Sequence, residues 1–139
     1  MTPGFIDVHS HASGGLSGNL KEARQLLAQG LTTVMINPDG GGPIDLRTQR
    51  GELEHRGVGV NVALYMPHGA IRREVIGMAD RAATGDELTR MVIIARNGME
   101  AGGIGLSSGL YCAPGSYVNE RGVVDLPFAI RSMTSLHTV

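Results

Sequence analysis

Short apolar runs alternate with amphipathic stretches along most of this chain. The apolar runs have the length of β-strands, and they cover residues 4–9, 31–37, 58–66 and 102–109. The amphipathic stretches between them predict helices or helical turns, and they cover residues 17–30, 43–56, 71–78 and 84–99. The resulting order β-α-β-α-β-α-β favours a parallel sheet whose strands are joined by crossover helices.

Local signals at the helix ends sharpen this prediction. Thr84 and Glu87 have the spacing of a capping box, so a helix is expected to begin there. Residues 17–30 are expected to form one helix that ends at Gly30. The apolar face of that helix would hold Leu20, Ala23 and Leu27. A further helix is expected within residues 120–133.

Two architectures accommodate this order of elements. One is an open, doubly wound sheet, and the other is part of a (βα)8 barrel. A complete barrel needs about 250 residues, so four strands in 139 residues amount to about half of one. No internal linker divides the chain, and a single domain over residues 1–139 is therefore expected.

Composition and charge narrow the class of protein. With 42% hydrophobic and 18% charged residues, the chain is typical of a globular domain. A net charge of -1 provides no electrostatic attraction for nucleic acid or an anionic membrane. No apolar run is long enough for a membrane span, and no secretion signal opens the chain. The single cysteine, Cys112, fits a reducing compartment, so a cytoplasmic location is expected.

The first predicted strand ends in a His-x-His pair, His9 and His11. Side chains two residues apart on an extended strand point to the same side, with about 7 Å between their α-carbons. Two imidazoles at the carboxyl end of a barrel strand can bind one divalent metal ion. The alternative is a pair of histidines that hydrogen-bond to backbone carbonyls or water. Asp7 shares their face and is either an orienting partner or an ordinary strand-end acid.

Polar side chains also follow the other predicted strands. Asp39, after the second strand, is a candidate for binding metal or substrate, and the alternative is a tightly bent glycine-rich loop. His68 and Arg72 are candidates for binding substrate, with surface exposure as their alternative, and Ser107 and Tyr111 are further candidates that could hydrogen-bond to it. A serine-hydrolase elbow is not indicated at Ser108, because Leu106 occupies the position of its first glycine.

Four stretches resemble one enzyme family in order and spacing. They are "PGFIDVHSH", "GLTTVMINPDGG", "PHGAIRREVIGM" and "AGGIGLSSGLYCAPGSY". Together they are similar to the amidohydrolase superfamily, and within it to the N-acyl-D-amino-acid deacylase (D-aminoacylase) branch, over roughly residues 3–117. The resemblance implies an α/β fold that is a partial (βα)8 TIM-type barrel of about four βα units, with residues 1–139 as a fragment of the barrel domain.

The resemblance also implies a chemistry and a set of ligands. The family hydrolyses the amide C–N bond of a small acylated amine or amino acid with a metal-activated water, and the expected cofactor is zinc, one or two ions. The family's His-x-His ligands correspond to His9 and His11. Its Asn-Cys-Gly ligand segment is replaced here by Asn-Pro-Asp-Gly, which leaves Asp39 as the substitute ligand. Tyr111 corresponds to a substrate-facing segment.

One departure from the family supports a different hypothesis. The family's further histidine ligands and its catalytic aspartate lie on later strands, beyond the motifs matched here, so no catalytic residue is assigned. The alternative function is a truncated, catalytically incompetent half barrel that only binds metal or self-associates. Its open sheet edges would favour self-association.

Overall fold

The computed structural model describes residues 2–79, 81–109, 117–118 and 124–125. Within these residues a four-stranded sheet consists of β1 (Phe5–Asp7), β2 (Leu31–Ile36), β3 (Asn61–Pro67) and β4 (Gly105–Ser107). The helices are α1 (Ser13–Ser17), α2 (Arg24–Leu27), α3 (Leu46–Arg56), α4 (His68–Ile76) and α5 (Gly85–Glu100). A separate pair of antiparallel strands is β5 (Tyr117–Val118) and β6 (Val124–Asp125).

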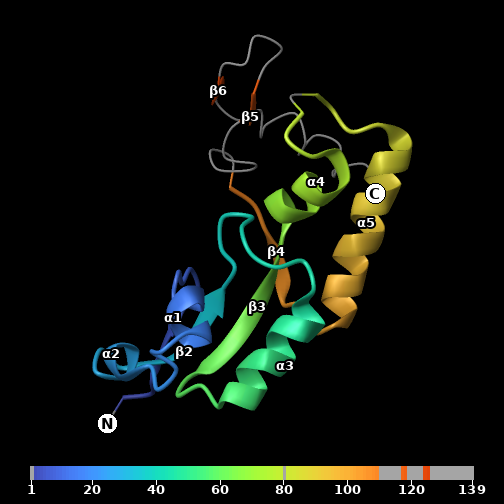
Figure 1. The fold of residues 1–139 in the computed structure, drawn as a ribbon. Coiled ribbons are helices and arrows are strands. Elements are labelled where there is room, and N and C mark those ends of the chain that lie inside the picture. Colours follow the sequence, from blue (N-terminus) through green and yellow to red (C-terminus); the bar gives the residue numbers. More distant parts are fainter. Residues whose placement is uncertain (1, 80, 110–116, 119–123, 126–139) are drawn as a thin grey trace.

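The sheet has the topology of a barrel segment. All neighbouring strands are parallel, and their order in space, β1-β2-β3-β4, is their order along the chain. A doubly wound sheet would reverse direction at a switch point, whereas a (βα)8 barrel adds each strand beside the one before it. Figure 1 shows β3 in the middle of the fold, where both α3 and α5 contact it. The predicted fold class, a partial (βα)8 barrel of about four units, is confirmed.

The hydrophobic core lies between the sheet and its helices. Along β2 and β3 the buried side chains alternate with partly exposed ones, as expected when one face of a strand is covered. The buried strand residues are Val34, Ile36, Leu64 and Met66, and the buried helix residues that join them in the core include Leu46, Leu53, Ile71, Ile76 and Met91. Gly98 of α5 packs directly on the Met66 side chain, where a β-carbon would collide with the sulfur. This close approach lets α5 pack directly against the sheet.

The expected single helix over residues 17–30 is wrong. The structure has two short helices, α1 and α2, and a non-helical segment lies between them. The backbone N–H of Gly59 donates to the carbonyl of Lys21 at 2.7 Å, and Ala23 takes a left-handed conformation with φ 52°. Ala23 is buried as predicted, but Leu20 and Leu27 are exposed. Docking of this segment against Gly59 therefore overrides the local helical preference.

The remaining helices match their sequence signals more closely. The capping box of α5 is present, since Thr84 Oγ1 accepts from the Glu87 N–H and a Glu87 carboxylate oxygen accepts from the Thr84 N–H. Helix α3 ends at Gly57, whose φ of 67° is the left-handed C-cap that glycine favours. Helix α4 is longer than the short turn predicted over residues 71–78, because it begins directly after Pro67.

The helix expected within residues 120–133 is contradicted at the two positions that the structure describes. Val124 and Asp125 form β6, which pairs with β5. The other residues of that range lie outside the described part of the chain. Among the helices that the structure describes, none has the length and apolar character needed to cross a membrane.

Candidate metal centre

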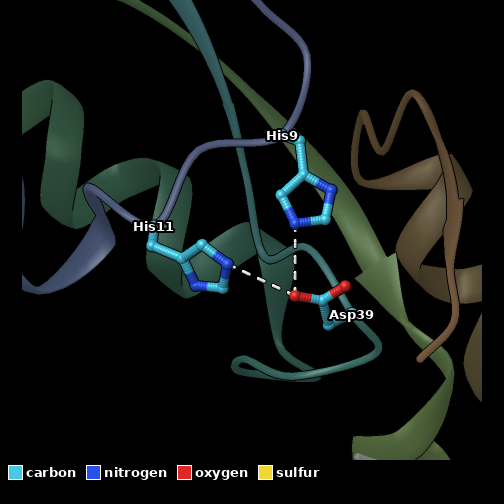
Figure 2. A group of neighbouring side chains, drawn as sticks. All are labelled: His9, His11 and Asp39. Carbon is cyan, nitrogen blue, oxygen red and sulfur yellow. Dashed lines mark ion pairs between the residues drawn. The ribbon is translucent and has the colours of Figure 1, made fainter. Parts of the chain in front are cut away.

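Three side chains with metal-binding atoms meet at the carboxyl ends of β1 and β2. His9 Nε2 lies 3.2 Å from Asp39 Oδ2, and His11 Nε2 lies 3.3 Å from the same oxygen (Figure 2). One donor atom from each residue falls within 4.8 Å of the others. The side chains are 58%, 72% and 40% exposed in the order His9, His11 and Asp39, so the cluster is open to solvent.

The backbone around the two histidines explains why both rings turn toward Asp39. Between them, Ser10 is buried and its N–H donates to the Met35 carbonyl at 2.9 Å, which ties the segment to β2. Asp7 Oδ1 accepts a hydrogen bond from the His9 N–H at 3.0 Å. Figure 2 shows the rings of His9 and His11 both directed toward the Asp39 carboxylate. Asp7 thus holds the backbone at His9.

The loop after β2 brings Asp39 to this position through an unusual backbone path. Asn37 and Asp39 both have left-handed φ values, 63° and 56°, and Gly40 follows at 72°. The Asn37 side chain is 2% exposed and pairs reciprocally with the amide of Gln49, at 2.8 and 3.1 Å. Asn37 Nδ2 also donates to the Tyr65 carbonyl at 3.2 Å. The buried amide pair anchors the start of the loop to α3 and β3.

The donor set fits a divalent metal ion. Two imidazole nitrogens and one carboxylate oxygen are ligands that zinc takes in catalytic sites, where a further position stays open. The two rings lie with their centroids 5.3 Å apart, so both nitrogens can approach a common point beside the carboxylate. This arrangement can bind one cation at the barrel mouth, and it leaves room for a small molecule beside that cation.

Two cavities adjoin Asp39. One, of about 370 Å³, is lined by His11, Asp39, Gly69 and Arg73 among others. The second, of about 240 Å³, is lined by His9, Asp39, Tyr65 and Ser107 among others. Asp39 lines both, so a molecule in either cavity would lie beside Asp39 and one of the two histidines.

The predicted substrate-binding residues lie in different surroundings. Arg72 is 2% exposed, and its Nη2 donates to the carbonyls of Ala79 and Arg81 at 2.9 and 3.0 Å. These contacts hold the connection between α4 and α5, and they lend no support to a role in binding substrate. Tyr111 lies outside the described residues.

His68 is the first residue of α4 and is buried. Its Nδ1 lies 3.5 Å from Ser108 Oγ, at the end of β4. Burial lowers the pKa of His68, and the nearby positive charge of Arg72 lowers it further. His68 therefore favours its neutral form, and it lines neither of the two cavities beside Asp39.

Sequence reasoning missed Arg73 and Gln49. Arg73 lines the larger cavity, whereas its neighbour Arg72 was the predicted candidate. Had α4 been predicted to begin at His68, helical spacing would have placed Arg72 on the buried face with Ile71 and Ile76. Gln49 carried no signal, because an amide in an amphipathic helix is usually solvated.

Comparison with known proteins places the chain beside one group of enzymes. No protein-family model matches it. It is 26% identical to a D-aminoacylase from Alcaligenes xylosoxydans xylosoxydans, over 91% of this chain and 31% of the relative. It is 28% identical to an N-acyl-D-aspartate deacylase from the same organism, over 91% of this chain and 30% of the relative. The chain thus spans about a third of the length of these relatives.

Solved structures agree with this result. A D-aminoacylase studied for its binuclear metal centre superposes with a TM-score of 0.68 at 28% identity, covering 77% of this chain and 27% of that one. An N-acyl-D-glutamate deacylase from Bordetella bronchiseptica, complexed with zinc and a phosphonate inhibitor, gives 0.67 at 26% identity, covering 78% and 27%. The predicted resemblance to N-acyl-D-amino-acid deacylases is confirmed in sequence and in fold, over part of their length.

Proposed function

We propose that these four βα units, with residues 1–139 as a fragment of one barrel domain, supply half of the metal site of an amidohydrolase that cleaves the amide C–N bond of N-acyl amino acids. The observation that carries the proposal is the convergence of His9, His11 and Asp39 at the barrel mouth. The matched deacylases are longer than this chain. The proposal therefore assigns metal binding to this chain and hydrolysis to a barrel that contains it.

In this proposal, Nε2 of His9, Nε2 of His11 and Oδ2 of Asp39 hold the metal, for which zinc is the first choice, as one or two ions. When bound, zinc supplies Lewis acidity, which polarises an amide carbonyl and makes water a better nucleophile. Asp7 keeps the His9 backbone in place, and the cavities beside Asp39 receive the substrate. We assign no catalytic base to the described residues.

The proposed substrates are small acylated amines or amino acids. Support comes from the names of the matched proteins, which act on N-acyl-D-aspartate and N-acyl-D-glutamate. The proposed location is the cytoplasm, because the chain has one cysteine and therefore no internal disulfide.

A metal-binding experiment tests the ligand assignment. Purified protein is stripped of metal and titrated with Co²⁺, whose visible absorption reports nitrogen and oxygen ligation, and zinc content is measured separately. The double variant His9→Ala, His11→Ala should lose the Co²⁺ spectrum. The variant His55→Ala removes an exposed histidine of α3 and should keep it. Equal metal content in the double variant and the wild type would overturn the assignment.

A second experiment tests the activity. A barrel that contains these residues is expected to hydrolyse N-acetyl-D-aspartate or N-acetyl-D-glutamate, and a chelator should abolish the release of free amine. Restoring zinc should restore the rate. Hydrolysis that persists after complete metal removal would contradict a metal-dependent mechanism.

A second candidate function is self-association of the half barrel. The observation that favours it is the exposure of apolar side chains on and beside the two outer strands, namely Phe5, Ile6, Val8, Ile104 and Leu106. In the described residues β1 and β4 each pair with one neighbour only, and such edges promote pairing with another chain. A second copy that placed its β1 beside β4 would extend the parallel order and complete eight strands. Light scattering should then show a dimer that Leu106→Lys dissociates, and a monomer at all concentrations would refute this candidate.

A further inference from the structure

The backbone that carries Asp39 is strained in isolation. Asn37 and Asp39 both lie in the left-handed region, which Asn and Asp enter more readily than other non-glycine residues but which still disfavours a side chain. Conformations of this kind persist only where surrounding contacts determine them. The position of the Asp39 carboxylate therefore depends on what holds the loop from residue 37 to residue 40.

Ser107 of β4 provides such a contact. Its hydroxyl donates to the Asn37 carbonyl at 2.6 Å and accepts from the Gly40 N–H at 3.1 Å. One side chain thus spans the two residues that flank Pro38 and Asp39. Ser107 lies 70 residues after Asn37 in the chain and on a strand that is two positions away in the sheet.

Close packing of glycines also holds this loop. A β-carbon on Gly109 would lie 2.5 Å from the Asp39 carbonyl oxygen, so the ends of β2 and β4 touch through backbone. A β-carbon on Gly40 would lie 2.9 Å from the Gly69 nitrogen, and the Ala70 N–H donates to the Gly40 carbonyl at 2.9 Å. The loop is therefore confined between the ends of β3 and β4, and the Ser107 hydroxyl is the side-chain contact that bridges it.

We propose that Ser107 is a positioning residue, which holds the Asp39 carboxylate in place for the metal. This role replaces the substrate contact predicted for Ser107 from the sequence, because its hydroxyl hydrogen is already donated to the Asn37 carbonyl. The inference rests on the proposed function, since it takes Asp39 as a ligand. Partners that orient ligands in this way typically change metal affinity by about 10- to 100-fold when removed.

The test compares Co²⁺ affinity in four forms of the protein. Ser107→Ala should weaken binding at least tenfold, and Ser107→Thr, which keeps a hydroxyl, should restore most of the affinity. Thr89→Ala is the matched control, because the Thr89 hydroxyl also donates to a backbone carbonyl, that of Gly85, but on the exposed surface of α5. Thr89→Ala should leave the affinity unchanged.

A double-mutant cycle separates positioning from general loosening of the fold. In an Asp39→Ala background, Ser107→Ala should have no further effect on Co²⁺ affinity, because the group that it positions is gone. An equal loss in both backgrounds would overturn the inference. If the wild type binds Co²⁺ and Ser107→Ala binds it equally well, the inference fails while the proposed function stands. A wild type that binds no Co²⁺ contradicts the proposed function instead.

Amide hydrogen exchange provides a readout that needs no metal. The Gly40 N–H donates to Ser107 Oγ, so Ser107→Ala should accelerate exchange at Gly40 while amides within α5 keep their protection. Unchanged exchange at Gly40 would overturn the inference that Ser107 holds the loop from residue 37 to residue 40, whatever the metal affinity.

Discussion

The buried amide pair between Asn37 and Gln49 yields the sharpest prediction about stability. In the variant Gln49→Leu the side chain keeps a similar size but loses both amide contacts, at 2.8 and 3.1 Å. Asn37 Nδ2 still has the Tyr65 carbonyl at 3.2 Å, but Asn37 Oδ1 loses the Gln49 donor inside the protein. A buried acceptor without its donor destabilises a protein by about 1–3 kcal/mol. We expect the free energy of unfolding to fall by that amount.

The assay is urea unfolding followed by circular dichroism, since the chain has no tryptophan. Gln29→Leu is the matched control, because it makes the same substitution at an exposed glutamine whose side chain bonds only locally, to the Gln25 carbonyl. That variant should change the unfolding free energy by less than about 0.5 kcal/mol. If the two variants lose equal stability, the reasoning that Gln49 satisfies a buried group is refuted.

Three further predictions concern other parts of the fold. Gly59→Ala should destabilise the protein by about 1–3 kcal/mol, because the new β-carbon would collide with the Glu22 backbone. Gly51→Ala, in an open stretch of α3, should instead stabilise it slightly. The midpoints of urea unfolding check both variants. Hydrogen bonds from Arg81 and then Thr84 lower the pKa of Glu87 to about 2, so its contribution to stability should be lost as pH falls from 4.5 towards 2, and Glu87→Gln should remove that part of an acid titration. Burial and then Arg72 lower the pKa of His68, so stability should fall as pH drops below its ordinary value of 6.5; a slope that persists in His68→Gln would contradict this assignment.

A parallel sheet and two of the three clustered side chains could be predicted from local patterns, and the choice of a partial barrel over a doubly wound sheet came from the family resemblance. Apolar runs revealed β2 and β3 because their buried faces must be apolar, and parallel order then places all strand ends at one mouth. His9 and His11 were expected to reach this mouth because they end the predicted first strand, and the structure places both just after β1. Asp39 followed from its place after β2 together with the family resemblance.

What could not be predicted depends on contacts between segments far apart in the sequence. The break in the expected helix over residues 17–30 results from docking against Gly59. The partner of Ser107 could not be inferred either, because a serine hydroxyl at a strand end can bond to substrate, water or backbone with equal ease. Its actual partners, Asn37 and Gly40, lie on a loop whose Asn, Asp and Gly residues favour a left-handed path, but those residues do not indicate which distant side chain contacts the loop.

The placement of the core on one side of the sheet has a consequence for how the chain folds. Each strand pairs with the strand before it, and the buried side chains of β2 and β3 pack on helices both near and far along the chain, since Gly98 of α5 contacts Met66 of β3. Pairing between parallel strands joins segments that are far apart in the sequence, and it is therefore slow to form. We expect the metal cluster to form late, once β4 has placed Ser107 and Gly109 against the loop that carries Asp39.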